Sequence, residues 1–123
     1  MNWKSYQTNV PEGKLGDWSI ERFEVTAEDE KLEILRAIFS GRRRYVPKGA
    51  YTRLVRCGTV IMRDTPDEIR DHYPVRRNAR GRVLINGLGL GIATEMALRN
   101  SEVDHVTVVE NSPEVIKLVS PYL

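Results

Sequence analysis

The sequence has little of several residue types that mark specialised protein classes. One cysteine, Cys57, and two histidines among 123 residues exclude an internal disulfide and leave no cysteine cluster for a metal. No apolar run approaches the roughly 20 residues that span a bilayer, and the polar start MNWKSYQTNVPEGK is unlike a secretory signal peptide. There is no internal repeat and no low-complexity tract. We therefore expect a cytoplasmic protein of a reducing compartment, without a metal site and without contact with a membrane.

The charged residues are present in ordinary number but are unevenly distributed. Hydrophobic residues make up 41% and charged residues 29%, which is typical of a globular chain. The net charge is +2, yet residues 41–82 carry twelve basic and four acidic side chains, while the segments on either side are each acidic by three. A basic segment of this kind is either a solvated face or a surface for nucleic acid or another polyanion. The triplet at 42–44 lies in no known nucleic-acid motif.

The first 80 residues predict a mixed α+β region. After an irregular arm over 1–16, the alternation in 17–25 predicts a strand. Thr26 and Gly41 are typical of the start and stop of a helix, in which Leu32, Leu35 and Phe39 form an apolar stripe backed by Ile34 and Ile38. Further along, 51–55 and 59–64 read as a hairpin, and 65–73 as a short helix ended by Pro74 and followed by a loop. That helix has the pattern of a capping box, formed by Thr65 and Glu68.

From residue 81 onward the pattern changes to strand, helix, strand, helix. We expect strands at 82–86 and 105–110, joined through a helix at 92–99 and followed by a helix at 113–119. This order is typical of adjacent parallel strands with a right-handed crossover. The unbroken apolar runs VLI and VTVV favour strands that are buried on both faces.

Three glycines, at positions 87, 89 and 91, follow the first of these strands directly. Glycine accepts positive φ and lets a ligand approach the backbone closely, and the next helix begins with free N–H groups. The spacing does not match the dinucleotide fingerprint, because Ile92 stands where its third glycine would be. The P-loop pattern also fails, since no Gly-Lys-Ser/Thr follows. The turn is suited to a nucleotide-like ligand that carries a carboxylate or a phosphate.

An acid ends the second strand of this unit. Glu110 lies 23 residues after Gly87, where a carboxylate can accept both hydroxyl hydrogens of a ribose. The alternative is an acid that only caps a helix or faces solvent. Its place at a strand end also predicts that its loss changes thermal stability little.

The stretches VLINGLGLGIATEMAL and VTVVENSPEVIKLV resemble the first two β-α units of the class I S-adenosylmethionine-dependent methyltransferases. The resemblance implies that Gly87, Leu88, Gly89 and Gly91 form the loop under the methionine part of S-adenosylmethionine or its product S-adenosylhomocysteine. It also implies that Glu110 binds the ribose. Asn86 stands where the family often has an acid on the methionine side. Asn111 lies where the adenine edge is usually approached, so both belong to the expected cofactor site.

The segment CGTVIMRDTPDEIRDH is similar in layout to the region before this core in the polyamine aminopropyltransferases (spermidine synthases). The chain also resembles phage- and actinobacterium-type methyltransferases of unassigned substrate. The layout places Asp71 and His72 toward the mouth of the cofactor site, unless His72 is only a surface or helix-end residue.

Together these patterns predict an α/β chain in two parts. Residues 1–80 form the hairpin and helix region, and residues 81–123 start a Rossmann-like parallel sheet that is incomplete. The resemblance places substrate and catalytic residues in a later half of the core, so no catalytic residue is assigned here. Two functions stay open: a methyltransferase or its cofactor-binding part, and a non-catalytic protein that binds a partner or nucleic acid through 42–82. A thin core also favours a homo-oligomer or a completing partner chain.

Overall fold

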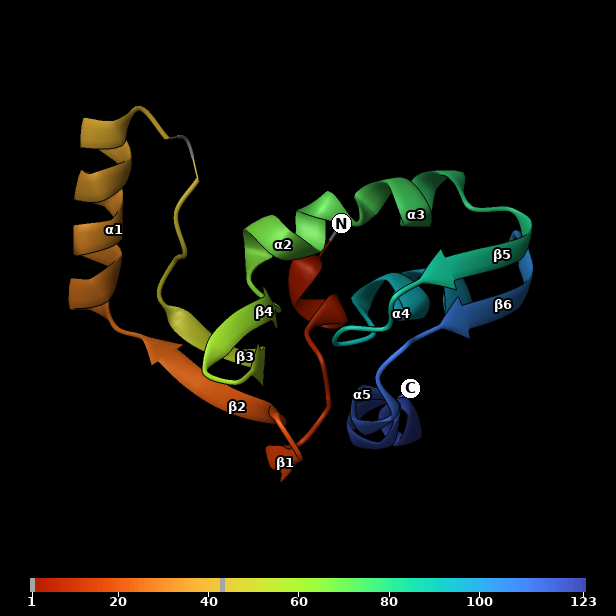
Figure 1. Ribbon diagram of the computed structural model, residues 1–123. Coiled ribbons are helices and arrows are strands. Elements are labelled where there is room, and N and C mark those ends of the chain that lie inside the picture. The colour runs from red at the N-terminus through yellow and green to blue at the C-terminus, as the bar shows by residue number, and fades with distance from the viewer. Residues whose placement is uncertain (1, 43) are drawn as a thin grey trace.

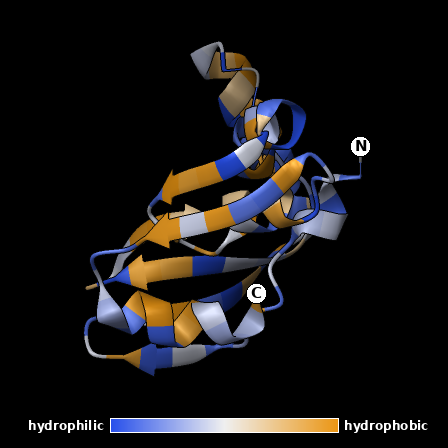
Figure 2. Cartoon of the chain, turned by 90° about the vertical axis from the view of Figure 1, so that its right-hand side faces the viewer, coloured by the Kyte–Doolittle hydropathy of each residue, from blue (hydrophilic) through white to orange (hydrophobic). Residues whose placement is uncertain are grey.

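The chain folds as an α/β protein with two separate sheets. The computed structural model describes residues 2–42 and 44–123, and Figure 1 shows the antiparallel sheet and the parallel strands on opposite sides of the N-terminal arm. The antiparallel sheet has four strands that pair in chain order, and the second sheet consists of two parallel strands. Apolar and polar residues follow one another along the strands (Figure 2).

The antiparallel sheet confirms the predicted strand and hairpin and adds one short strand. The turn between the last two strands consists of Cys57 and Gly58, both with positive φ. Two left-handed residues form the tight turn whose twist matches a hairpin. The short first strand lies in the arm that we expected to be irregular. The strands are β1 (Gly13–Leu15), β2 (Trp18–Val25), β3 (Gly49–Arg56) and β4 (Thr59–Arg63).

The predicted long helix, α1 (Ala27–Ser40), is confirmed together with both of its ends. Thr26 and Asp29 form a reciprocal capping box, and Gly41 closes the helix in the left-handed conformation. The apolar stripe of α1 is exposed. Ala37 is its only buried residue, and the leucines of the stripe point to solvent. The periodicity fixed which residues share a face, but it did not fix which way that face is turned.

Two short helices follow where one helix and a loop were expected. They are α2 (Pro66–Asp71) and α3 (Tyr73–Asn78). Pro74 lies in the first turn of α3, where its missing N–H costs nothing, so it starts a helix and does not only end one. The expected capping box of α2 is absent, because Glu68 instead accepts the Arg63 N–H and pairs with the Arg63 guanidinium.

The C-terminal β-α-β-α order is confirmed. It consists of β5 (Gly81–Asn86), α4 (Ile92–Leu98), β6 (Val103–Val109) and α5 (Pro113–Val119). The expectation of burial on both faces is wrong within this chain. Burial alternates along both strands, and Leu84 and Val109 remain 63% and 54% exposed. One sheet face therefore has no cover from the described residues.

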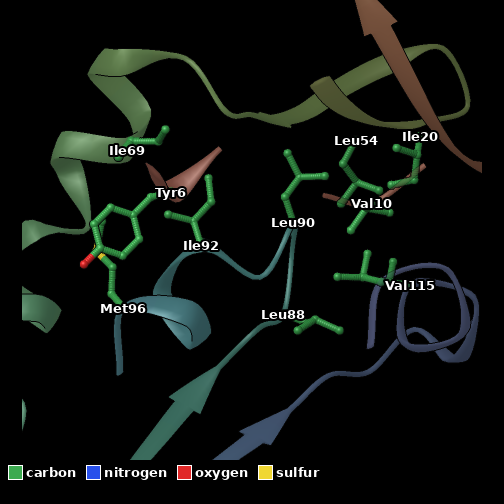
Figure 3. Packing of buried hydrophobic residues seen from close by; sticks show 11 residues of the cluster. Tyr6, Val10, Ile20, Leu54, Ile69, Leu88, Leu90, Ile92, Met96 and Val115 are labelled. Carbon is green, nitrogen blue, oxygen red and sulfur yellow. The ribbon is translucent and has the colours of Figure 1, made fainter. Parts of the chain in front are cut away.

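One hydrophobic cluster joins the two sheets. The N-terminal arm, which begins with the short helix η1 (Trp3–Tyr6), places Tyr6 and Val10 in this cluster. Figure 3 shows Leu90 between Ile92 and the pair formed by Leu54 and Val10. Side chains from the arm, the antiparallel sheet and the turn after β5 thus pack in a single core.

A buried carboxylate fastens the arm to the antiparallel sheet. Asp64 is 1% exposed, and it accepts the Thr52 N–H at 2.6 Å and the Thr8 N–H at 3.1 Å. Burial raises the pKa of Asp64, while these amides and the charge of Arg22 act in the opposite direction. The paired amides make this buried acid tolerable, because each of its oxygens has a donor.

Candidate functional site

The glycine turn links the end of β5 to the start of α4. Gly87, Gly89 and Gly91 have φ of 92°, 55° and 80°, so all three lie in the left-handed region that favours glycine. The Gly91 N–H donates to the Leu88 carbonyl at 2.9 Å and closes the turn. The conformation of the backbone alone therefore accounts for a glycine at each of these positions.

The residues between the glycines anchor the turn. Leu88 and Leu90 are both buried in the shared core, and Figure 3 shows them on successive parts of the turn. The two leucines alternate with the glycines, and their buried side chains hold the backbone of the turn against the core. The turn is thus a fixed element and not a loose loop.

The three glycines have different surroundings. A Cβ at Gly89 would lie 2.6 Å from Met62 Sδ, and one at Gly91 would lie 2.5 Å from Leu123 Cδ2. A Cβ at Gly87 would meet nothing within 4 Å. Two of the glycines therefore make room for the protein's own side chains. Gly87 is the one beside which space is open to a ligand.

Glu110 follows β6 and is hydrogen-bonded to the glycine turn. Its Oε1 accepts the Leu88 N–H at 2.9 Å, and its Oε2 accepts the Ser112 N–H at 3.0 Å. The Gly87 N–H also donates to the Val109 carbonyl, at 2.7 Å, so the turn is joined to β6 at two points. A carboxylate has about four acceptor positions, and two of them remain for hydroxyl groups. The predicted acid and the predicted turn therefore lie side by side, with acceptor capacity left over.

The other predicted cofactor residues lie around this pair. Asn86 is the last residue of β5 and is exposed, and Asn111 is exposed just beyond Glu110. The Asn111 Oδ1 accepts the Ser112 hydroxyl at 3.4 Å. Both asparagine side chains are thus accessible on either side of the joined turn and acid. Gly89 and Gly91, by contrast, face Met62 and the C-terminal leucine.

Asp71 does not face the glycine turn. Its carboxylate pairs with Arg44 at 2.8 Å, which turns it toward the link between α1 and β3. His72 lies between α2 and α3 and is half-buried. Burial lowers the pKa of His72, and the carboxylates of Asp71 and Glu68 oppose this. The position of His72 at a helix end fits the structural alternative, and its side chain has no hydrogen bond to the turn within the described part of the chain.

Residues distant in sequence border the turn, and sequence patterns did not indicate them. The Leu90 N–H points to Met62 Sδ at 3.4 Å, and the Leu90 carbonyl accepts the Thr8 hydroxyl at 3.4 Å. A shallow recess beside the start of α4 is lined by residues including Tyr6, Gly91, Arg99 and Tyr122. The unbroken apolar run Val60 to Met62 in β4 does not single out Met62, and no signal in the arm predicts that Thr8 reaches the turn.

Most of the described basic side chains in the segment 41–82 are exposed. Arg77 and Arg80, in and after α3, and Arg82, in β5, are all exposed. None of the three forms a salt bridge with a carboxylate of the described residues, whereas Arg44, Arg53 and Arg63 each do. Positive charge that has no carboxylate partner among the described residues thus gathers near the start of β5.

Among residues 2–42 and 44–123, no helix combines the length and the apolar character that crossing a bilayer needs. Comparison of the chain with protein-family models, with curated proteins and with solved structures gave no match.

Proposed function

We propose that the turn after β5 binds S-adenosylmethionine, and that the chain is the cofactor-binding part of a class I methyltransferase with a Rossmann-like core. The observation that carries the proposal is the contact between Glu110 and the Leu88 amide, beside the open position at Gly87. A ribose placed over this contact has an oriented carboxylate as acceptor for its two hydroxyls. The cofactor supplies an electrophilic methyl group on a sulfonium centre.

The remaining residues of the turn would bind the other parts of the cofactor. The exposed backbone at Gly87 allows close approach, because no side chain of the protein fills the space beside it. Asn86 offers an amide toward the methionine end, and Asn111 offers one toward the base. No residue is assigned to methyl transfer, and the acceptor of the methyl group is not identified.

Calorimetric titration with S-adenosylmethionine and with S-adenosylhomocysteine tests the proposal. We expect binding by the unmodified chain and weaker binding by Glu110→Ala. Loss of hydrogen bonds to a charged acceptor costs about 1.5–3 kcal/mol, which is roughly a ten- to hundredfold loss of affinity. Glu102→Ala is the matched control, because Glu102 is an exposed acid that precedes β6 at its other end.

Circular dichroism must first show that each variant is folded at the titration temperature. No heat from the unmodified chain with either compound would contradict cofactor binding. Equal affinities of the unmodified chain and Glu110→Ala would contradict the role of Glu110.

The exposed arginines favour a second candidate function. Arg77, Arg80 and Arg82 would let a non-catalytic relative of the methyltransferases bind nucleic acid or an acidic partner. Phosphate contacts of this kind weaken steeply as salt increases. Replacement of all three by glutamine would then abolish binding to a short DNA or RNA duplex and leave calorimetry with S-adenosylmethionine unchanged. A duplex that binds both proteins equally, or neither, would contradict this function.

A further inference from the structure

Helix α1 has an apolar face that nothing in the described structure covers. Leu32, Leu35, Ile38 and Phe39 are exposed, and the Phe39 side chain reaches 88% exposure. Figure 1 shows α1 at the end of the molecule farthest from β5 and β6. The opposite side of the helix, with Ala37, faces the rest of the chain. An apolar face of this size on an exposed helix marks an interaction surface.

The spacing on this face is that of a helix-pairing seam. Glu28, Leu32, Leu35 and Phe39 follow one another at intervals of four, three and four residues. Residues at these intervals form one stripe along a helix, and this stripe packs against a second helix in coiled coils. The occupant that the pattern fits is therefore another helix.

The charges at the two ends of this stripe have opposite signs. The first turn of α1 contains Glu28, Asp29 and Glu30, whereas Arg36 and Arg42 lie in and just beyond the second half of the helix. Neither Glu28 nor Arg42 forms a salt bridge within the described residues. Two copies of α1 placed antiparallel would bring each acidic end against a basic end. A parallel pair would bring like charges together.

We propose that α1 pairs antiparallel with α1 of a second copy of this chain. The two-fold axis passes near Leu35, which lies midway between Leu32 and Phe39. Each α1 has 14 residues and is about 21 Å long, so the pair buries less area than a stable obligate dimer does. The dimer is accordingly weak and reversible, and it does not depend on cofactor binding.

Sedimentation equilibrium over a wide range of protein concentration tests the pairing. The unmodified chain should approach the dimer mass as its concentration rises. Leu35→Ser should weaken the dimer about tenfold or more, because the axis places this residue in the interface twice. Leu84→Ser is the matched control, since it removes an exposed leucine from the uncovered face of β5. Circular dichroism verifies that both variants are folded.

A charge exchange tests the direction of the pairing. Glu28→Arg alone and Arg42→Glu alone should each weaken the dimer, and the double variant should restore it. A strictly monomeric unmodified chain would overturn the proposal. So would a dimer that Leu84→Ser dissociates and Leu35→Ser leaves intact, because the uncovered sheet would then be the interface. Failure of the double variant to recover would overturn the antiparallel arrangement.

Discussion

At the scale of single residues, Glu110 joins the two halves of the candidate site. Its carboxylate accepts one hydrogen bond from an amide of the glycine turn and one from an amide at the start of α5. The position at a strand end had suggested that its loss would change stability little. The two hydrogen bonds alter this expectation, because Glu110→Ala leaves the part-buried Leu88 amide without its acceptor.

We predict that Glu110→Ala lowers the free energy of unfolding by about 1–3 kcal/mol in the absence of any ligand. Urea denaturation measures this, and Glu102→Ala should stay within about 0.5 kcal/mol of the unmodified chain. Equal stability of Glu110→Ala and the unmodified chain would show that the carboxylate does not hold the turn in solution.

Asp64 makes the second residue-scale prediction, which concerns pH. Burial raises its pKa above the ordinary value of 3.8, so the native state holds the proton more tightly than the unfolded state does. The contribution of Asp64 is then largest at acidic pH and falls as the pH rises through the raised pKa. Asp64→Asn cannot titrate. The free energy of unfolding of the unmodified chain should therefore fall relative to that of this variant as the pH rises from about 4.

Denaturation curves for both proteins at a series of pH values measure this difference, with Asp104→Asn as the exposed control. If the free energy of unfolding of the unmodified chain instead rose relative to that of Asp64→Asn, the amides of Thr8 and Thr52 would lower the pKa of Asp64 more than burial raises it.

Some contacts of the candidate site join residues of one local sequence pattern, and others join residues that lie far apart along the chain. Positive φ at the glycines and the meeting of Glu110 with the turn follow from a local strand-turn-helix-strand pattern, which the sequence displays. The contacts of Met62 with Gly89, and of Leu123 with Gly91, join segments that no periodicity relates. For this reason Gly89→Val would disturb Met62 as well as any ligand, and Glu110 is the better probe of binding.

At the scale of elements, residues at the two ends of α1 predicted its start at Thr26 and its end at Gly41. The order of strands and helices predicted the parallel pairing of β5 with β6. The sequence did not predict which face of an element is exposed, because burial depends on what packs against that element. Leu84 shows this, since an apolar run that favours a doubly buried strand has one bare face here.

The capping box of α1 gives a prediction at this scale. Thr26 Oγ1 accepts the Asp29 N–H, and Asp29 accepts the Thr26 N–H in return. Thr26→Ala should cost about 1 kcal/mol of helix stability. Because α1 buries so little, the loss should appear as faster amide hydrogen exchange within α1, with the global unfolding midpoint nearly unchanged. Thr26→Ser keeps the acceptor and should exchange as the unmodified chain does; a uniform loss of stability would mean that α1 is coupled to the core.

At the scale of the whole molecule, the N-terminal arm connects what the sequence presents as two regions. Thr8 donates its N–H to Asp64 and its hydroxyl to the carbonyl of Leu90, so it bonds to the end of β4 and to the glycine turn. Val10 then enters the cluster that contains Leu54 and Val115. Because this one core holds side chains from both sheets, neither sheet should unfold without the other.

We therefore predict that Val10→Ala destabilises both sheets together. Removal of two buried methyl groups costs about 2 kcal/mol, including the cavity that is left. Tryptophan fluorescence follows the antiparallel sheet and the arm, through Trp18 in β2 and through Trp3, which stacks on Tyr51 of β3. Amide exchange in β6 follows the parallel sheet. Both measurements should show one transition with the same loss of unfolding free energy. Val60→Ala, at an exposed position, should change the unfolding free energy by no more than about 0.5 kcal/mol in either measurement. If fluorescence and exchange instead gave two separate transitions, the arm would not couple the sheets, and the candidate site would belong to a unit that is stable by itself.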